Sequence, residues 1–173
     1  MKAGFVKIGL TAALVVVLFS GSATTASNEC SRIGTWHGMG DQGFVWMAVD
    51  SPGQDATNGQ LTIEWVMIDP TLGGFFPDAA RITNGIGVWK KVNKQMYQYT
   101  WIAYGLDQDG IPIYTGRASG TATLADCNHV NLTYVLELWL AGEDISTDAP
   151  FFCAPGTATE TRMSFVQASC PAE

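Results

Sequence analysis

The stretch QMYQYTWIAYGLDQDGIPIYTGRASGTATL, residues 95–124, decides the fold of this chain. Apolar and polar residues alternate with a period of two on both sides of a central turn, Asp107-Gln108-Asp109-Gly110. A period of two is typical of a strand, and Asp and Gly are typical of a tight turn. The stretch therefore predicts two long antiparallel strands joined as a hairpin.

The same alternation continues along most of the chain, and helical periodicity is nearly absent. Eight strands in hairpin order can close into a barrel, which leaves no exposed sheet edge. We therefore predict an all-β fold, an eight-stranded antiparallel up-and-down barrel, with a β-sandwich as the alternative. The lumen of such a barrel is either filled by side chains or holds one small ligand. The predicted strands are residues 33–39, 43–50, 60–69, 82–92, 95–106, 111–124, 131–141 and 157–168.

Residues 1–26 have the features of a cleavable secretory signal. They combine a basic start, an apolar run at residues 8–19 and small residues before a cleavage site at Ala26. A membrane anchor would need about 18 apolar residues, which is more than this run contains. We expect residues 27–173 to form one secreted or periplasmic domain that does not insert into a membrane after the leader is removed.

The composition bears on the partners of the domain. Sixteen Asp and Glu residues outnumber nine Lys and Arg residues. This acidic balance repels phosphate backbones, so we do not expect nucleic acid as a partner. The whole chain has six Trp, five Tyr and eight Phe residues, and aromatic residues can line a pocket for a small apolar molecule.

Four cysteines follow the leader, and an even number in an exported chain predicts two disulfides. Three pairings are open. Neither the cysteines nor His37 and His129 have the spacing of metal ligands, so we expect no metal and no cofactor. The cysteines are Cys30, Cys127, Cys153 and Cys170.

Two Gly-x-Trp triplets, Gly34-Thr35-Trp36 and Gly87-Val88-Trp89, lie in predicted strands, and the second precedes the aromatic strand and acidic hairpin of residues 95–124. Together with Thr161-Arg162-Met163, these motifs resemble bacterial exported lipocalin-like, or calycin-like, β-barrel domains over most of the mature chain. The resemblance implies structural roles for Trp36, Arg162 and Trp89. In such barrels the first-strand Trp lies at the closed end, and a basic residue of the last strand packs across its indole. Function is then expected at the opposite, open end.

The first functional hypothesis is a barrel that binds a small apolar or aromatic ligand in its lumen. The candidate ligand-binding residues are Tyr97, Tyr99, Trp101 and Arg117. The three aromatic residues share one face of their predicted strand. Arg117 would bind an anionic group if its polar face turned inward, and it would lie outside the barrel if the small residues of that strand faced the lumen instead.

The second hypothesis is a barrel-type cyclase or isomerase. Glu64 and Glu137 each lie among apolar neighbours on their strand, and a carboxylate in an apolar lumen has a raised pKa and can act as a general acid or base. The alternative is that both lie on the wet outer side of the sheet. A third hypothesis is an interaction or inhibitor protein that uses the loop at residues 69–80, with Phe75 and Phe76 as exposed anchors.

Overall fold

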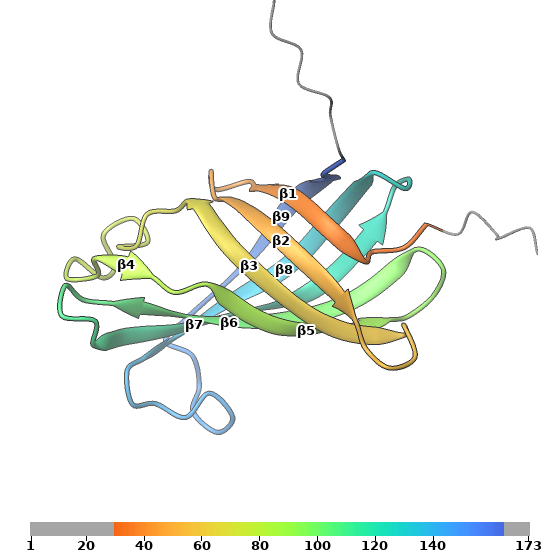
Figure 1. Cartoon of the computed structure of the whole chain (residues 1–173). Coiled ribbons are helices and arrows are strands. Elements are labelled where there is room, and N and C mark those ends of the chain that lie inside the picture. The colour runs from red at the N-terminus through yellow and green to blue at the C-terminus, as the bar shows by residue number, and fades with distance from the viewer. Residues whose placement is uncertain (1–29, 165–173) are drawn as a thin grey trace, which may run out of the picture.

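The structure is a computed structural model that describes residues 30–164, and these residues contain nine β-strands (Figure 1). Each strand pairs antiparallel with its neighbour in the barrel, and β1 pairs with β9, which closes the sheet on itself. Eight strands form the barrel, while the two-residue β4 pairs only with β6. This confirms the predicted all-β up-and-down barrel and excludes the sandwich. The strands are β1 (Gly34–Gly40), β2 (Val45–Pro52), β3 (Asn58–Met67), β4 (Arg81–Ile82), β5 (Gly85–Lys91), β6 (Met96–Leu106), β7 (Pro112–Leu124), β8 (His129–Leu140) and β9 (Phe152–Arg162).

The last strand differs most from its prediction, because it begins at Phe152 and not at Thr157. Pro155 lies before the predicted strand, and it is tolerated inside β9. The backbone N–H and C=O of Thr157 both bond to Asp41, on the β1 side of the strand. The nitrogen of Pro155 points to that same side, two residues earlier, where β1 has already ended at Gly40 and no ladder bond is lost. Residues 165–168 of the predicted strand lie outside the described residues.

The predicted strand at residues 82–92 is divided between β4 and β5. The backbone N–H of Thr83 bonds to Tyr104, and its hydroxyl accepts the backbone N–H of that same residue. The Thr83 hydroxyl thus takes the place of a backbone oxygen as the acceptor for Tyr104, which interrupts the regular ladder. β4 and β5 therefore lie along the same edge of β6 with registers that differ by one residue: Ile82 lies opposite Gly105, and Ile86 lies opposite Ile102.

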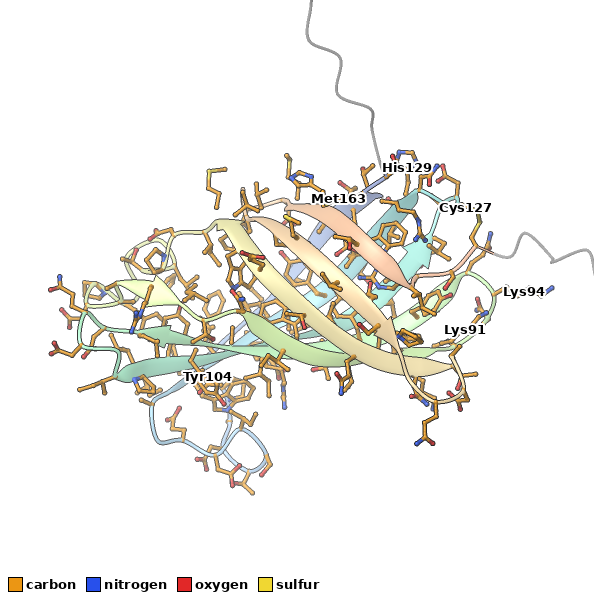
Figure 2. All side chains as sticks on the ribbon, viewed as in Figure 1. Lys91, Lys94, Tyr104, Cys127, His129 and Met163 are labelled. Carbon is orange, nitrogen blue, oxygen red and sulfur yellow. A yellow bond between two sulfur atoms is a disulfide. The ribbon has the colours of Figure 1, made fainter. Side chains whose placement is uncertain are left out.

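The inner face of the barrel forms the core. Inward positions alternate with outward ones along every long strand, as the period of two requires. Trp36, Trp89 and Leu61 are among the most deeply buried side chains. Outward residues such as Tyr104 point away from the sheet into solvent, as Figure 2 shows.

The two ends of the barrel differ in how they are closed. At one end lie the beginning of β1, the end of β9 and three short turns, and Cys127 and Met163 mark this end in Figure 2. At the other end lie the longer segments 68–80 and 141–151 (Figure 1). Within residues 30–164 no helix has the length and hydrophobicity needed to span a lipid bilayer.

Candidate functional site

The lumen holds a cavity with a volume of about 60 Å³, between the closed end and the loops of the open end. Small side chains on β6 and β7, at Ala103, Gly116 and Ala118, leave this space unfilled. A larger hollow of about 430 Å³ lies outside the barrel beside Val88, but it is open to solvent and does not enclose a ligand. The aromatic lining residues of the lumenal cavity are Phe44, Trp46, Trp65, Tyr99, Trp101, Tyr114 and Tyr134.

The inner end of the cavity is a buried ionic cluster of Arg32, Asp50 and Glu160, which we call the floor. Each of the three is at most 2 % exposed. Arg32 Nε lies 3.0 Å from Asp50 Oδ2, and Arg32 Nη1 lies 2.8 Å from Glu160 Oε2. These distances are those of ion pairs, although the contacts do not have the angles of hydrogen bonds. Trp46 donates its indole N–H to Glu160 Oε1 over 3.0 Å and fixes that carboxylate.

The protonation of the floor follows from its burial. Desolvation opposes a charge on Arg32, but the carboxylates of Glu160 and Asp50 outweigh it and raise the pKa of the guanidinium. Burial raises the pKa of Asp50 to about 7; Arg32 opposes this rise and Glu160 adds to it. One arginine therefore serves two carboxyl groups, and burial favours the protonated form of Asp50.

Below the floor, Trp36 and Arg162 close the barrel. The guanidinium carbon of Arg162 lies 4.2 Å from the centroid of the Trp36 ring, in the arrangement that the resemblance implied. Arg162 also donates to the backbone oxygens of Cys127 and Ile33, each over 2.8 Å, and to that of Ser31. This one side chain ties β9 to the segment before β1 and to the turn between β7 and β8.

The open end is covered by residues 69–80, which we call the lid. Phe76 is 5 % exposed and stacks on Tyr114, with ring centroids 4.2 Å apart. The Tyr114 hydroxyl donates to the backbone oxygen of Pro70, and Leu72 of the lid reaches the cavity. Phe75 is 62 % exposed, so only one of the two predicted aromatic anchors is available at the surface.

The predicted ligand-binding residues of β6 all point inward, and two of them line the cavity. These two are Tyr99 and Trp101. Tyr97 lies closer to the closed end, where it packs edge-on against Trp89 with centroids 5.7 Å apart. Trp89, predicted to be structural, is 2 % exposed and donates its indole N–H to the backbone oxygen of Gln60.

Arg117 lies on the outer face of β7, where it cannot reach a ligand in the lumen. It pairs with Glu137 of β8 at 2.8 Å, and its guanidinium carbon lies 4.7 Å from the centroid of the Trp139 ring. The loop at residues 141–151 folds over this group: Arg117 donates to the oxygen of Ile145. Trp139 donates its indole N–H to the backbone oxygen of Asp148 in the same loop. Its side chain is only 1 % exposed, although it lies on the outer side of the barrel.

Neither carboxylate of the enzyme hypothesis lines the cavity. Glu64 is exposed on the outer face of β3, opposite Met47. Glu137 is held by Arg117 on the far side of the barrel wall. Both carboxylates thus lie on the outer side of the sheet, which was the alternative expectation. Among the described residues, Glu160 is the carboxylate that lines the cavity.

One of the two expected disulfides is present among the described residues. Cys30 and Cys127 are bonded and join the segment before β1 to the turn between β7 and β8, over 97 residues of sequence. Cys153 is exposed and has no disulfide partner within residues 30–164, while Cys170 lies outside that range. A disulfide is compatible with an oxidising compartment such as the periplasm or the cell exterior. The predicted leader also lies outside the described residues.

Sequence reasoning missed the three floor residues. Asp50 and Glu160 could have been found, because Asp50 follows Trp46 and Ala48 on one face, and Glu160 follows Ala158. A charged residue on an otherwise apolar inward face was the available signal. Arg32 precedes the first strand, so no periodicity indicated where it points.

No known family model matches this chain, and no curated protein matches it at a significant level.

Proposed function

We propose that this protein is an exported lipocalin-like barrel that binds a small apolar or aromatic molecule in its lumen. The observation that carries the proposal is the apolar, aromatic-lined cavity between the polar floor and the lid. The Trp36–Arg162 stack and the predicted leader support the family and the exported location.

The volume of the cavity limits which ligands fit while the lid is closed. A cavity of about 60 Å³ is far below the roughly 300 Å³ at which pockets for drug-sized ligands begin. A ring compound therefore needs the lid to move. Leu72 is the side chain of the lid that reaches the cavity, so its displacement enlarges the site directly.

A filled lumen tests this proposal. Ala118→Leu places a larger side chain in the cavity, and Ser119→Leu places the same side chain on the outer face of the same strand. Native mass spectrometry of the protein purified from its own host is expected to show a bound small molecule in the wild type and in Ser119→Leu, and none in Ala118→Leu. A bare protein mass in all three samples would contradict the proposal.

The interaction hypothesis has one observation in its favour, the 62 % exposure of Phe75 in the lid. Phe75→Ser leaves the packed Phe76 in place. Loss of a captured partner protein by this variant, with the lumenal ligand retained, would favour an interaction role over ligand carriage.

A further inference from the structure

The indole N–H groups of the barrel are almost all bonded, with one exception in the cavity wall. The bonded groups and their acceptors are Trp36 to Arg32 O, Trp46 to Glu160 Oε1, Trp65 to Thr83 O, Trp89 to Gln60 O, and Trp139 to Asp148 O. The sixth tryptophan, Trp101, has no hydrogen-bond acceptor within residues 30–164. Trp101 is only partly buried, and its N–H is not among the sealed polar atoms of the described residues, so this unused donor stays accessible.

Tyr99 repeats this feature two residues earlier on the same face of β6. It is 6 % exposed, and among the described residues its hydroxyl has no hydrogen-bond partner. The other cavity tyrosines are bonded, Tyr114 to the backbone oxygen of Pro70 and Tyr134 to Asp41. The cavity wall on β6 thus presents two polar groups in succession that the protein leaves unused.

Both groups remain reachable by a small molecule. In the described part of the chain, the fully sealed side-chain polar atoms that lack a hydrogen bond belong to Arg32, Asp50 and Glu160, and not to Tyr99 or Trp101. The burial and the negative charge of Glu160 raise the pKa of the Tyr99 hydroxyl, so it keeps its proton and can donate.

The orientation of Trp101 is set by its neighbours. A Cβ at Gly85 of β5 would lie 3.4 Å from Trp101 Cε3, so this edge of the indole lies against β5. The N–H is on the opposite edge of the ring and therefore points away from β5. On the other side of β6, Gly116 and Ala118 are the small residues that leave the cavity open.

The floor determines which charge a ligand can carry. Arg32 is already matched by two carboxyl groups, at 3.0 and 2.8 Å. A ligand carboxylate would add a third acidic group beside a single arginine in a desolvated site, which is strongly unfavourable. The cavity therefore selects against anions.

We infer that the lumen takes an uncharged, mainly apolar molecule with one carbonyl-type acceptor, which receives the N–H of Trp101 and the O–H of Tyr99. A carbonyl oxygen has two lone pairs and can accept both bonds. Residues two apart on a strand share a face, so both donors project from the same side of β6 into the lumen. This inference rests on the proposed ligand-binding function and names the chemical class of the ligand.

Three probes of one size separate the possibilities: acetophenone, its isosteric alkene 2-phenylpropene, and benzoate. Binding is measured with ¹⁵N-labelled protein by following the six indole N–H signals, of which Trp101→Phe identifies one by its loss. Acetophenone is expected to shift the Trp101 proton downfield and to bind about tenfold more tightly than the alkene, since two donors gain an acceptor. Benzoate is expected to bind more weakly than either neutral probe.

Variants assign the preference to the two donors. Tyr99→Phe and Trp101→Phe are each expected to reduce the ketone-over-alkene preference while the alkene still binds. Trp65→Phe is the matched control, because Trp65 also lines the cavity but its N–H is already bonded to Thr83, and it is expected to keep the preference. Tyr99→Phe removes only one oxygen, so it tests the inference even if Trp101→Phe fails to fold.

The outcomes separate this inference from the proposed function. Equal affinity for ketone and alkene, with an unmoved Trp101 signal, would overturn the acceptor inference and leave lumenal binding intact. Tightest binding of benzoate would also overturn it. Failure of all three probes to bind would contradict the proposed function, and the inference would fall with it.

Discussion

Trp36 contacts separate parts of the chain at the closed end of the barrel. Its indole N–H donates to the backbone oxygen of Arg32 over 2.7 Å, and Arg162 lies across its ring. Trp36→Ala is expected to lower the free energy of unfolding by about 3 to 5 kcal/mol, because it empties a completely buried site. Chemical denaturation measures this, with the exposed neighbour His37→Ala as the control. An equally small effect of both changes would show that the closed end does not depend on this packing.

Asp50 makes the stability of the folded protein depend on pH in the direction opposite to ordinary acid denaturation. The folded state holds the Asp50 proton up to about pH 7, whereas the unfolded chain releases it near the usual pKa of 3.8. Between these values the folded state binds more protons, so this group makes the protein less stable as pH rises.

The prediction is made for the difference between the wild type and Asp50→Asn. From about pH 4 to about pH 7 the wild type is expected to lose stability relative to this variant, by up to about 1.4 kcal/mol per pH unit. Urea denaturation at a series of pH values measures the difference and removes the contribution of the surface carboxylates. Parallel stability curves over this range would mean that Asp50 is ionised throughout.

At the scale of single residues, the alternation along a strand predicts which side chains share a face, but not which residues they contact. The sequence predicted that Tyr97, Tyr99 and Trp101 share one face, and they do. It left the side of Arg117 open, because its strand has polar residues on one face and small residues on the other. The structure resolves this: Gly116 and Ala118 face the lumen and line the cavity, so the polar face with Arg117 turns outward.

The lid is the element in which two neighbouring phenylalanines have different roles. Phe76 packs between Tyr114 and Phe151, with a centroid distance of 5.5 Å to the latter, whereas Phe75 is exposed. Phe76→Ala is expected to destabilise the closed lid by roughly 3 kcal/mol, the usual cost of losing a buried phenylalanine. Amide exchange in residues 69–80 should then accelerate by roughly two orders of magnitude.

Phe75→Ala is the control for this lid prediction, since it removes a ring of the same size from the same loop. We expect its amide exchange to stay within a few-fold of the wild type, although its ring also lies near Phe152, with a centroid distance of 5.4 Å. Faster exchange in Phe75→Ala than in Phe76→Ala would reverse the assignment of anchor and surface residue.

At the scale of elements, the hairpins were predictable and the long rim segments were not. A period of two with Asp and Gly between strands defines a hairpin locally. The 69–80 and 141–151 segments have no period, so the sequence cannot tell which of their aromatic residues is buried. Their positions depend on contacts far along the chain, such as Tyr114 with Pro70 and Trp139 with Asp148.

The closure of the whole molecule depends on one pairing between its first and last strands. Trp36 lies opposite Arg162 and Gly40 lies opposite Ala158 in the ladder between β1 and β9. The backbone N–H of Met163 donates to the backbone oxygen of Thr35 over 2.9 Å, so the start of the first strand and the end of the last strand are adjacent in space. In a closed sheet every strand has two neighbours, and no strand is required to be first.

A circular permutant tests this closure directly. A short Gly-Ser linker joins Ser164 to Cys30, and the new chain begins at Asp109 and ends at Gln108, in the exposed turn between β6 and β7. The permutant is expected to fold, with the far-UV circular dichroism and the indole N–H signals of the parent, because Arg162 and Met163 already bond to the segment at residues 31–35 and the linker has a short distance to span. A permutant with the same linker but opened between Thr100 and Trp101, inside β6, is expected to remain unfolded. If the first permutant also fails while the uncut residues 30–164 fold, the ends of β1 and β9 are not neighbours, and the sheet is open and not a barrel.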